Sequence, residues 1–156
     1  MKFFLIFTVP FLFYVPNDLK KLRKEFVLLE NSEKAIYEIK KIATSTSEVS
    51  LPVKSAYVAV AEMTSAKYKL NPISRLSAFN SGKKLLESAI KADSLNPEII
   101  FIRYTIQTQV PSFLGYSKNI SRDQEFLISR LNSIKIDDAE LYSTIYNYLI
   151  YKGNKK

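Results

Sequence analysis

The side chains that could do chemistry in this sequence are carboxylates, lysines, tyrosines and hydroxyls, because its 156 residues include no His and no Cys. Nucleophile pairs that depend on His or Cys, and metal sites built from imidazole or thiolate, are therefore excluded. The carboxylate pairs do not suit acid–base catalysis: Asp123 and Glu125 point to different sides of a helix, and Asp137 and Asp138 lie at a helix start. We expect no catalytic residue, no metal ligand and no cofactor.

The composition indicates one helical domain with a substantial core. Hydrophobic residues make up 47% of the chain and aromatic residues 13%, whereas there are only three glycines, too few for a turn-rich β fold. The net charge of +8 is spread along the chain instead of being gathered on one segment. A nucleic-acid-binding surface concentrates its basic residues, so we expect no nucleic-acid partner.

Two Asn-Pro pairs mark helix starts. Asn71-Pro72 and Asn96-Pro97 each precede a helical apolar pattern. An Asn side chain can accept hydrogen bonds from the first free N–H groups of a helix, and Pro fits the first helical position. The two pairs therefore predict consecutive helices joined by short turns.

The apolar spacing extends this pattern to the rest of the chain. It predicts an all-α fold of six or seven helices, packed as antiparallel hairpins, in one domain over residues 17–156. The dense run at 99–102 could also be a strand, but the Asn-Pro start favours a buried helix. In the helix from Pro72 the apolar spacing places six residues on one side: Ile73, Leu76, Phe79, Leu86, Ala89 and Ile90. The expected helices cover residues 17–30, 33–43, 52–68, 72–93, 97–109, one from 119 or 121, and one from Asp137, with a capping box to Glu140, to Gly153.

The loop at residues 110–116 is the candidate binding site. It is apolar and aromatic where solvated loops are polar. Pro111 ends the preceding helix, and Gly115 is expected to adopt a positive φ. The side chains of Phe113, Leu114 and Tyr116 either plug one end of the core or line a pocket for a partner or ligand.

The N-terminal segment, residues 1–16, is expected to be an export signal or an uncleaved membrane tether. Lys2 is followed by an apolar run from Phe3 to Val15, which has the length of a signal-peptide core and is short for a membrane span. A buried element of the domain is the third interpretation. The export interpretation predicts a location in the periplasm or cell envelope.

Two stretches carry family resemblances. Gly82, Leu86 and Ala89, followed by Asn96-Pro97-Glu98, resemble the second helix of a tetratricopeptide (TPR) repeat and the turn after it, which implies TPR-like helix pairs in the central half of the chain. The segments AYVAVAEMTSAKYKLNPISRLSAFNSGKKLLESAI and NPEIIFIRYTIQTQVPSFLGYSKNISRDQEFL resemble a group of small uncharacterised exported proteins of Gram-negative bacteria. That resemblance implies a helical fold and export, and it implies no activity.

These observations lead to three hypotheses of function. The first is a non-enzymatic interaction module of the cell envelope that binds a protein or peptide through the 110–116 loop, comprising Pro111, Phe113, Leu114, Gly115 and Tyr116. The second is a carrier of an apolar small ligand in a cavity between helices. The third is a membrane-surface protein that uses the basic residues of the first helix, which are Lys20, Lys21, Arg23 and Lys24.

Overall fold

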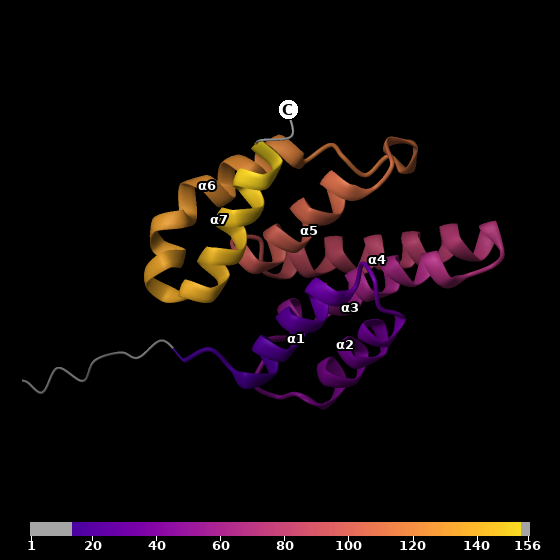
Figure 1. Cartoon of the computed structure of the whole chain (residues 1–156), viewed down its shortest axis with the longest axis horizontal. Coiled ribbons are helices and arrows are strands. Elements are labelled where there is room, and N and C mark those ends of the chain that lie inside the picture. The colour runs from indigo at the N-terminus through magenta and orange to yellow at the C-terminus, as the bar shows by residue number, and fades with distance from the viewer. Residues whose placement is uncertain (1–13, 154–156) are drawn as a thin grey trace, which may run out of the picture.

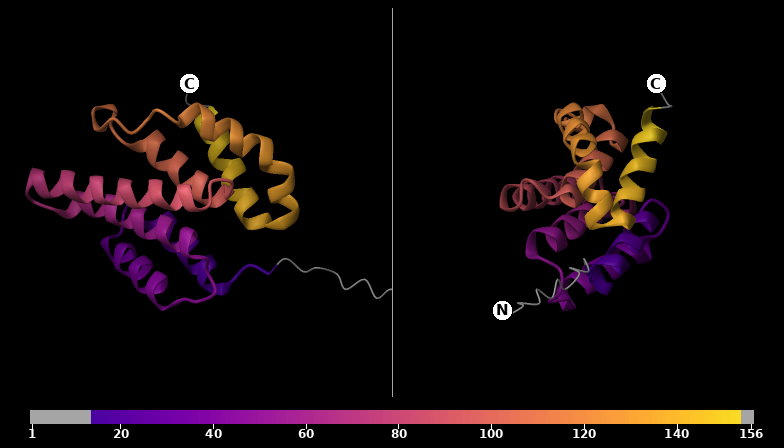
Figure 2. Two further views of the ribbon diagram at one scale, coloured as in Figure 1. Left: turned by 180° about the vertical axis from the view of Figure 1, so that it is seen from behind. Right: turned by 90° about the vertical axis from the view of Figure 1, so that its left-hand side faces the viewer.

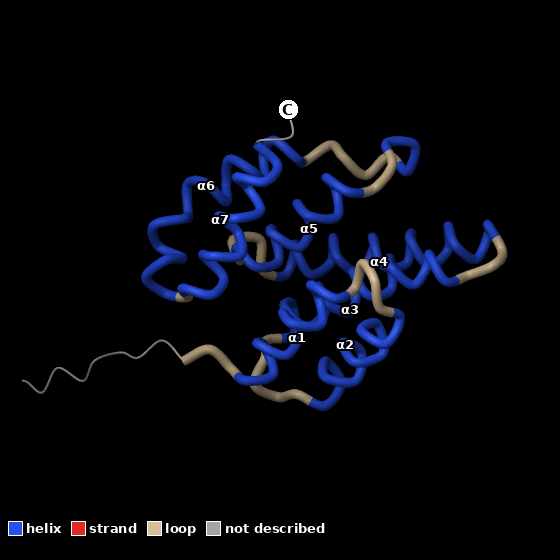
Figure 3. The backbone as a smooth tube through the Cα atoms, viewed as in Figure 1, coloured by secondary structure: helices blue, strands red, loops and turns tan. Residues whose placement is uncertain are grey.

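The computed structural model describes residues 14–153, and this part of the chain folds into helices without any strand (Figures 1 and 3). The segment predicted to direct export lies almost entirely outside the described residues. The seven α-helices and two short 3-10 helices of the described part are α1 (Asn17–Leu28), α2 (Glu33–Ser45), α3 (Leu51–Ser65), η1 (Ala66–Tyr68), α4 (Pro72–Ala92), α5 (Pro97–Gln109), η2 (Ser112–Leu114), α6 (Ile120–Asp137) and α7 (Ala139–Gly153).

Neighbouring helices pack against one another as antiparallel hairpins (Figure 1). α1 packs on α2, α3 on α4, and α5 on α6, and α7 then returns along α6. α3 also contacts both α1 and α5, so it joins the first half of the protein to the second. The prediction of an all-α fold with about seven helices is confirmed.

The predicted helix starts are formed by the expected hydrogen bonds. Asn71 Oδ1 accepts a hydrogen bond from the amide of Ile73 at 2.7 Å, and Asn96 Oδ1 accepts one from the amide of Glu98 at 3.1 Å. At α7 the prediction is wrong by one residue, because Asp138 caps the helix and Asp137 ends α6. α6 runs to Asp137 and leaves a single residue between the two helices, so only Asp138 is placed to accept from the first turn of α7.

α5 is the central helix of the protein. Ten consecutive residues, 98–107, are buried. A helix that is buried on every side needs apolar residues on all its faces, and this explains why the run at 99–102 shows no amphipathic period. The helical interpretation of this run is confirmed.

α4 projects beyond the rest of the molecule (Figure 2). It has 21 residues, whereas its partner α3 has 15, and residues 71–77 at its start are all exposed. Ile73 and Leu76, the first two residues of the predicted apolar side, have exposed fractions of 79% and 52%, whereas the later residues of that side are buried. The apolar spacing does point to one side of the helix, but no other helix reaches far enough to cover that side here.

α3 and α4 approach each other closely at Gly82. A Cβ atom added to Gly82 would lie 2.5 Å from the carbonyl oxygen of Ala59 and 2.5 Å from the side chain of Met63. Ala56 and Ala59 supply the small side chains of α3, and both are fully buried. The absence of a side chain at residue 82 thus permits this contact between the backbones.

Replacement of Gly82 by Ala tests this contact. Ala favours a helix by about 1 kcal/mol over Gly, but its methyl group would overlap the backbone of α3. We expect a net loss of about 1–3 kcal/mol in the free energy of unfolding. Urea denaturation measures the change, and Ser81→Ala, at an exposed site on the same helix, is the control. Equal or greater stability of Gly82→Ala would contradict the close approach.

Candidate binding cleft and the 110–116 loop

A cleft runs across the odd-numbered helices. Two adjoining hollows of about 750 Å³ and about 230 Å³ share part of their lining, including Thr64, Ile106 and Tyr148. We refer to both together as the inner cleft. All four odd-numbered helices contribute to its walls, among them through Phe26 of α1, Thr64 of α3, Phe101 and Ile106 of α5, and Thr144 and Tyr148 of α7. A hollow of this size is typical of binding sites.

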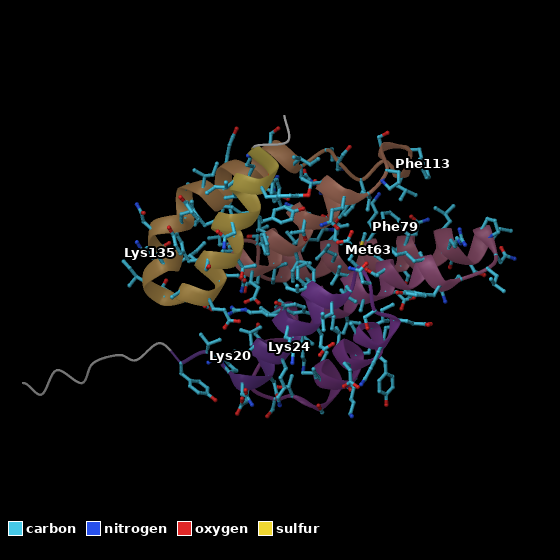
Figure 4. All side chains as sticks on the ribbon, viewed as in Figure 1. Lys20, Lys24, Met63, Phe79, Phe113 and Lys135 are labelled. Atoms are coloured by element: carbon cyan, nitrogen blue, oxygen red, sulfur yellow. The ribbon has the colours of Figure 1, made fainter. Side chains whose placement is uncertain are left out.

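The lining of the inner cleft combines apolar walls with a polar margin. Phe26, Phe79 and Phe101 supply aromatic surface, and Figure 4 shows Phe79 beside Met63 of α3. The charged residues among the described lining are Glu30 and Lys67, both exposed. Among the described lining residues, Phe79 of α4 is the one that comes from an even-numbered helix. α2 and α6 contribute none and therefore lie behind the odd-numbered helices.

The candidate loop lies at one end of this cleft, and its residues have different environments. Val110, Pro111 and Leu114 line the larger hollow. Phe113 is 84% exposed and points into solvent (Figure 4). Gly115 has the expected positive φ, at 61°, and its amide donates to the carbonyl of Ser112 at 3.0 Å. The loop therefore brings two of the five candidate residues, Pro111 and Leu114, to the cleft.

Tyr116 anchors the loop in the core. It is 2% exposed, its hydroxyl donates a hydrogen bond to Glu87 Oε1 at 2.6 Å, and its ring packs edge-on against Phe79 at 6.2 Å between centroids. The ammonium group of Lys83 lies 5.0 Å from the centre of the same ring. Tyr116 therefore plugs one end of the core, as one of the two interpretations of the loop expected.

Two alanine substitutions separate these environments. Tyr116→Ala should lower the free energy of unfolding by about 3–5 kcal/mol, because it leaves a cavity and removes one of the hydrogen-bond donors to Glu87. Phe113→Ala should change it by less than about 0.5 kcal/mol, because the ring is solvated. Thermal and urea denaturation of both variants measure the difference. Similar stabilities of the two variants would contradict the division of the loop described here.

Arg23 of α1 connects its own helix to α5 and to the start of α7, beside the smaller hollow of the cleft. It is 8% exposed, and its guanidinium forms two hydrogen bonds of 2.9 Å with the carboxylate of Glu98 on α5. It also donates to Asp138, the cap of α7, at 2.6 and 3.2 Å. Burial by itself would lower the pKa of Arg23, but the hydrogen bonds to the two carboxylates outweigh it and raise the pKa.

Arg103 connects α5, α6 and α4 through a second cluster of buried hydrogen bonds. Its guanidinium pairs with both carboxylate oxygens of Asp123 at 2.6 and 2.7 Å, and both residues are almost completely buried. A third contact, of 3.3 Å, reaches Glu87, the same carboxylate that accepts from Tyr116. The geometry is the bidentate pairing that arginine and carboxylate favour. This cluster connects the loop to the core.

Two buried tyrosines face these carboxylates. Tyr57 donates a hydrogen bond to Glu98, and burial together with the charge of Glu98 raises its pKa well above the ordinary value. Burial and the hydrogen bond to Glu87 likewise raise the pKa of Tyr116. In both cases ionisation would place a phenolate beside a carboxylate.

High pH should therefore destabilise the protein through these two hydroxyls. Their pKa values are raised in the folded state, so their contribution is complete below the unfolded value of about 10 and is lost as the pH rises above it. Each should remove about 1.4 kcal/mol from the free energy of unfolding per pH unit in that range. Urea denaturation at several alkaline pH values measures the slope. Tyr57→Phe and Tyr116→Phe should each reduce this slope by the contribution of one proton, about 1.4 kcal/mol per pH unit. Unchanged slopes would contradict the assignment.

Of the four basic residues of α1 that were predicted to contact a membrane surface, one is buried. Lys20 and Lys24 are exposed (Figure 4), and Lys21 pairs with Asp18 at 2.8 Å. Arg23, the fourth residue predicted to contact a membrane surface, is inside the protein. The surface of α1 therefore carries three of the four basic side chains.

The carboxylates considered for catalysis are not paired with one another. Asp123 is bound by Arg103 and Glu125 is exposed, while Asp138 is bound by Arg23 and Asp137 is exposed. Within residues 14–153 no group of three acidic side chains is close enough to hold a metal ion. No helix of this part is both long and apolar enough to cross a membrane.

The two arginine clusters were not predicted from the sequence. Arg23 was assigned to a membrane-contacting surface, and Glu98 was named only as part of the resemblance to a TPR turn. One signal was present, because Glu98 and Arg103 are charged residues in a run that is otherwise dense in apolar side chains. Charges are rarely buried without partners, so these two residues were a signal from which two buried ion pairs could have been predicted.

The fold and the cleft define an all-α protein of helical hairpins with an open cleft along one side. No protein-family model, curated protein or solved structure matches the chain. The resemblances to TPR helix pairs and to exported proteins of Gram-negative bacteria stay predictions.

Proposed function

We propose that this protein is a non-enzymatic interaction module that binds an extended polypeptide segment in the inner cleft. The observation that supports this most is that one cleft is lined by all four odd-numbered helices. In this proposal the helix pairs are TPR-like in packing, with the first helix of each pair facing the ligand. The predicted export signal assigns the module to the periplasm or cell envelope.

The shape and lining of the cleft favour a polypeptide. Exposed residues such as Lys67, Gln109 and Pro111 form part of the wall, so the hollow opens to solvent along its margin. A carrier of an apolar ligand would enclose most of the ligand surface. An extended segment could place apolar side chains against Phe101 and Ile106 and leave its polar backbone at the margin.

The loop at residues 110–116 has a defined role in this proposal. Pro111 and Leu114 close one end of the cleft and would contact the end of the bound segment. Gly115 and Tyr116 fix the position of the loop, because Gly115 provides the left-handed turn and Tyr116 is bound to Glu87. The exposed ring of Phe113 would lie outside the cleft and contribute little.

Blocking the cleft tests the proposal. The double variant Val27→Arg with Thr144→Arg places long charged side chains on the facing walls from α1 and α7, where both residues line the cleft and are exposed. Peptides selected on the wild-type protein from a random library should bind this variant at least about tenfold more weakly, because apolar contacts are lost and charges are desolvated. Fluorescence anisotropy of labelled peptides measures the affinities.

The control carries the same substitutions on even-numbered helices. Ile128→Arg with Thr44→Arg replaces one exposed aliphatic and one exposed threonine that do not line the cleft. This variant should bind the selected peptides as the wild type does. Selection of no peptide, or equal weakening in both variants, would refute binding in the cleft.

A further inference from the structure

The tip of the α3–α4 hairpin, residues 66–77, has an unusual surface. Leu70 is 96% exposed, Ile73 79% and Leu76 52%, and Tyr68 beside them is also exposed. Contiguous apolar side chains on a soluble surface indicate a contact site. Figures 1 and 2 show this tip as the end of the longest projection of the molecule, away from α6 and α7.

The tip is ordered by its own hydrogen bonds. The amide of Ile73 donates to Asn71 Oδ1 at 2.7 Å, and Arg75 Nε donates to the carbonyl of Lys69 at 2.6 Å. The aliphatic side chains are therefore held outward on a capped helix. Their exposure is a property of the folded hairpin.

The same hairpin carries a one-sided charge. Between Glu62 and Glu87 the sequence has five basic residues and no acidic residue: Lys67, Lys69, Arg75, Lys83 and Lys84. Among the described residues none of Lys67, Lys69 and Arg75 forms a salt bridge with a carboxylate. The partner of this surface should therefore carry negative charge.

The exposure pattern selects the kind of partner. Residues 71–77 are exposed without interruption over about two helical turns, so exposed side chains point in every direction around the start of α4. A flat protein surface covers one side of a helix, whereas a tip inserted into a lipid interface is surrounded. A second copy of this chain would place the basic residues of two tips against each other, which is unfavourable.

We infer that the α3–α4 tip inserts into the interface of a membrane that contains anionic lipid. Leu70, Ile73 and Leu76 would enter the boundary between headgroups and acyl chains, and Lys69 and Arg75 would contact the phosphates. The inserted residues do not line the inner cleft, whose lining includes only Ala66 and Lys67 at the base of the hairpin tip, and they are separate from the basic residues of α1. The inference therefore does not depend on the proposed peptide binding.

Tryptophan fluorescence can detect this insertion locally, since the sequence of 156 residues contains no Trp. Ile73→Trp should give a blue-shifted emission with vesicles of phosphatidylcholine and phosphatidylglycerol, and brominated acyl chains should quench it. Leu95→Trp, at an exposed leucine of the α4–α5 turn, is the control and should remain in water. The comparison holds even if another segment of the chain also binds the vesicle. An Ile73→Trp emission that vesicles do not change would overturn the inference and would leave an acidic protein as the partner to seek.

Charge neutralisation provides the second measurement. Lys69→Gln with Arg75→Gln, introduced into the Ile73→Trp protein, should lower its affinity for anionic vesicles about 30-fold. Each basic group near such a surface contributes about 1 kcal/mol. Lys34→Gln with Lys41→Gln, at exposed sites of α2, is the matched control and should have little effect. An equal reduction in both variants would indicate attraction by net charge alone and would refute the specific contact.

Discussion

Burial of α5 requires the burial of two charges that the helix carries. Glu98 and Arg103 lie among aliphatic and aromatic residues, and an isolated charge at such a site would cost several kcal/mol. Arg23 and Asp123 supply the opposite charges with bidentate geometry, and Asp138 and Glu87 complete the two clusters. An ion pair of this kind adds little net stability compared with apolar packing, but loss of one partner is costly. The clusters therefore specify which helices pack against α5 and in which position.

These clusters also connect the walls of the inner cleft. Arg23 connects α1 through Glu98 to α5 and through Asp138 to the start of α7, and these three helices form walls of the cleft. Arg103 and Glu87 do the same for the end that contains the 110–116 loop, because Glu87 accepts the hydrogen bond from Tyr116. The width of the cleft is thus defined by charged contacts in the core, and its surface by apolar residues of the odd-numbered helices.

The two proposed surfaces divide the outside of the molecule by shape and charge. The cleft is concave and combines apolar walls with a polar margin that includes Glu30 and Lys67, whereas the α3–α4 tip is convex and basic. The interior contributes to this difference, because the arginine clusters withdraw more acidic than basic side chains from the surface. A protein held at a membrane by the tip would keep the cleft accessible from solution, and the two proposals are compatible for that reason.

Local chemistry made the helical architecture predictable, and the predictions were most accurate where one interaction between near neighbours decides the outcome. Asn71 and Asn96 cap their helices, Gly115 takes a positive φ, and Pro111 follows the end of α5. The cleft, the arginine clusters and the exposed tip depend on contacts between residues 16 to 115 positions apart or on where a neighbouring helix ends. Apolar spacing predicted which side Ile73 would occupy on α4, but only the tertiary structure showed that nothing covers that side, because α3 is the shorter helix. The sequence by itself determined an all-α chain with defined helix starts, since caps and turns are local, whereas the positions of the charged partners, the cleft and the exposed tip were decided by packing over long separations.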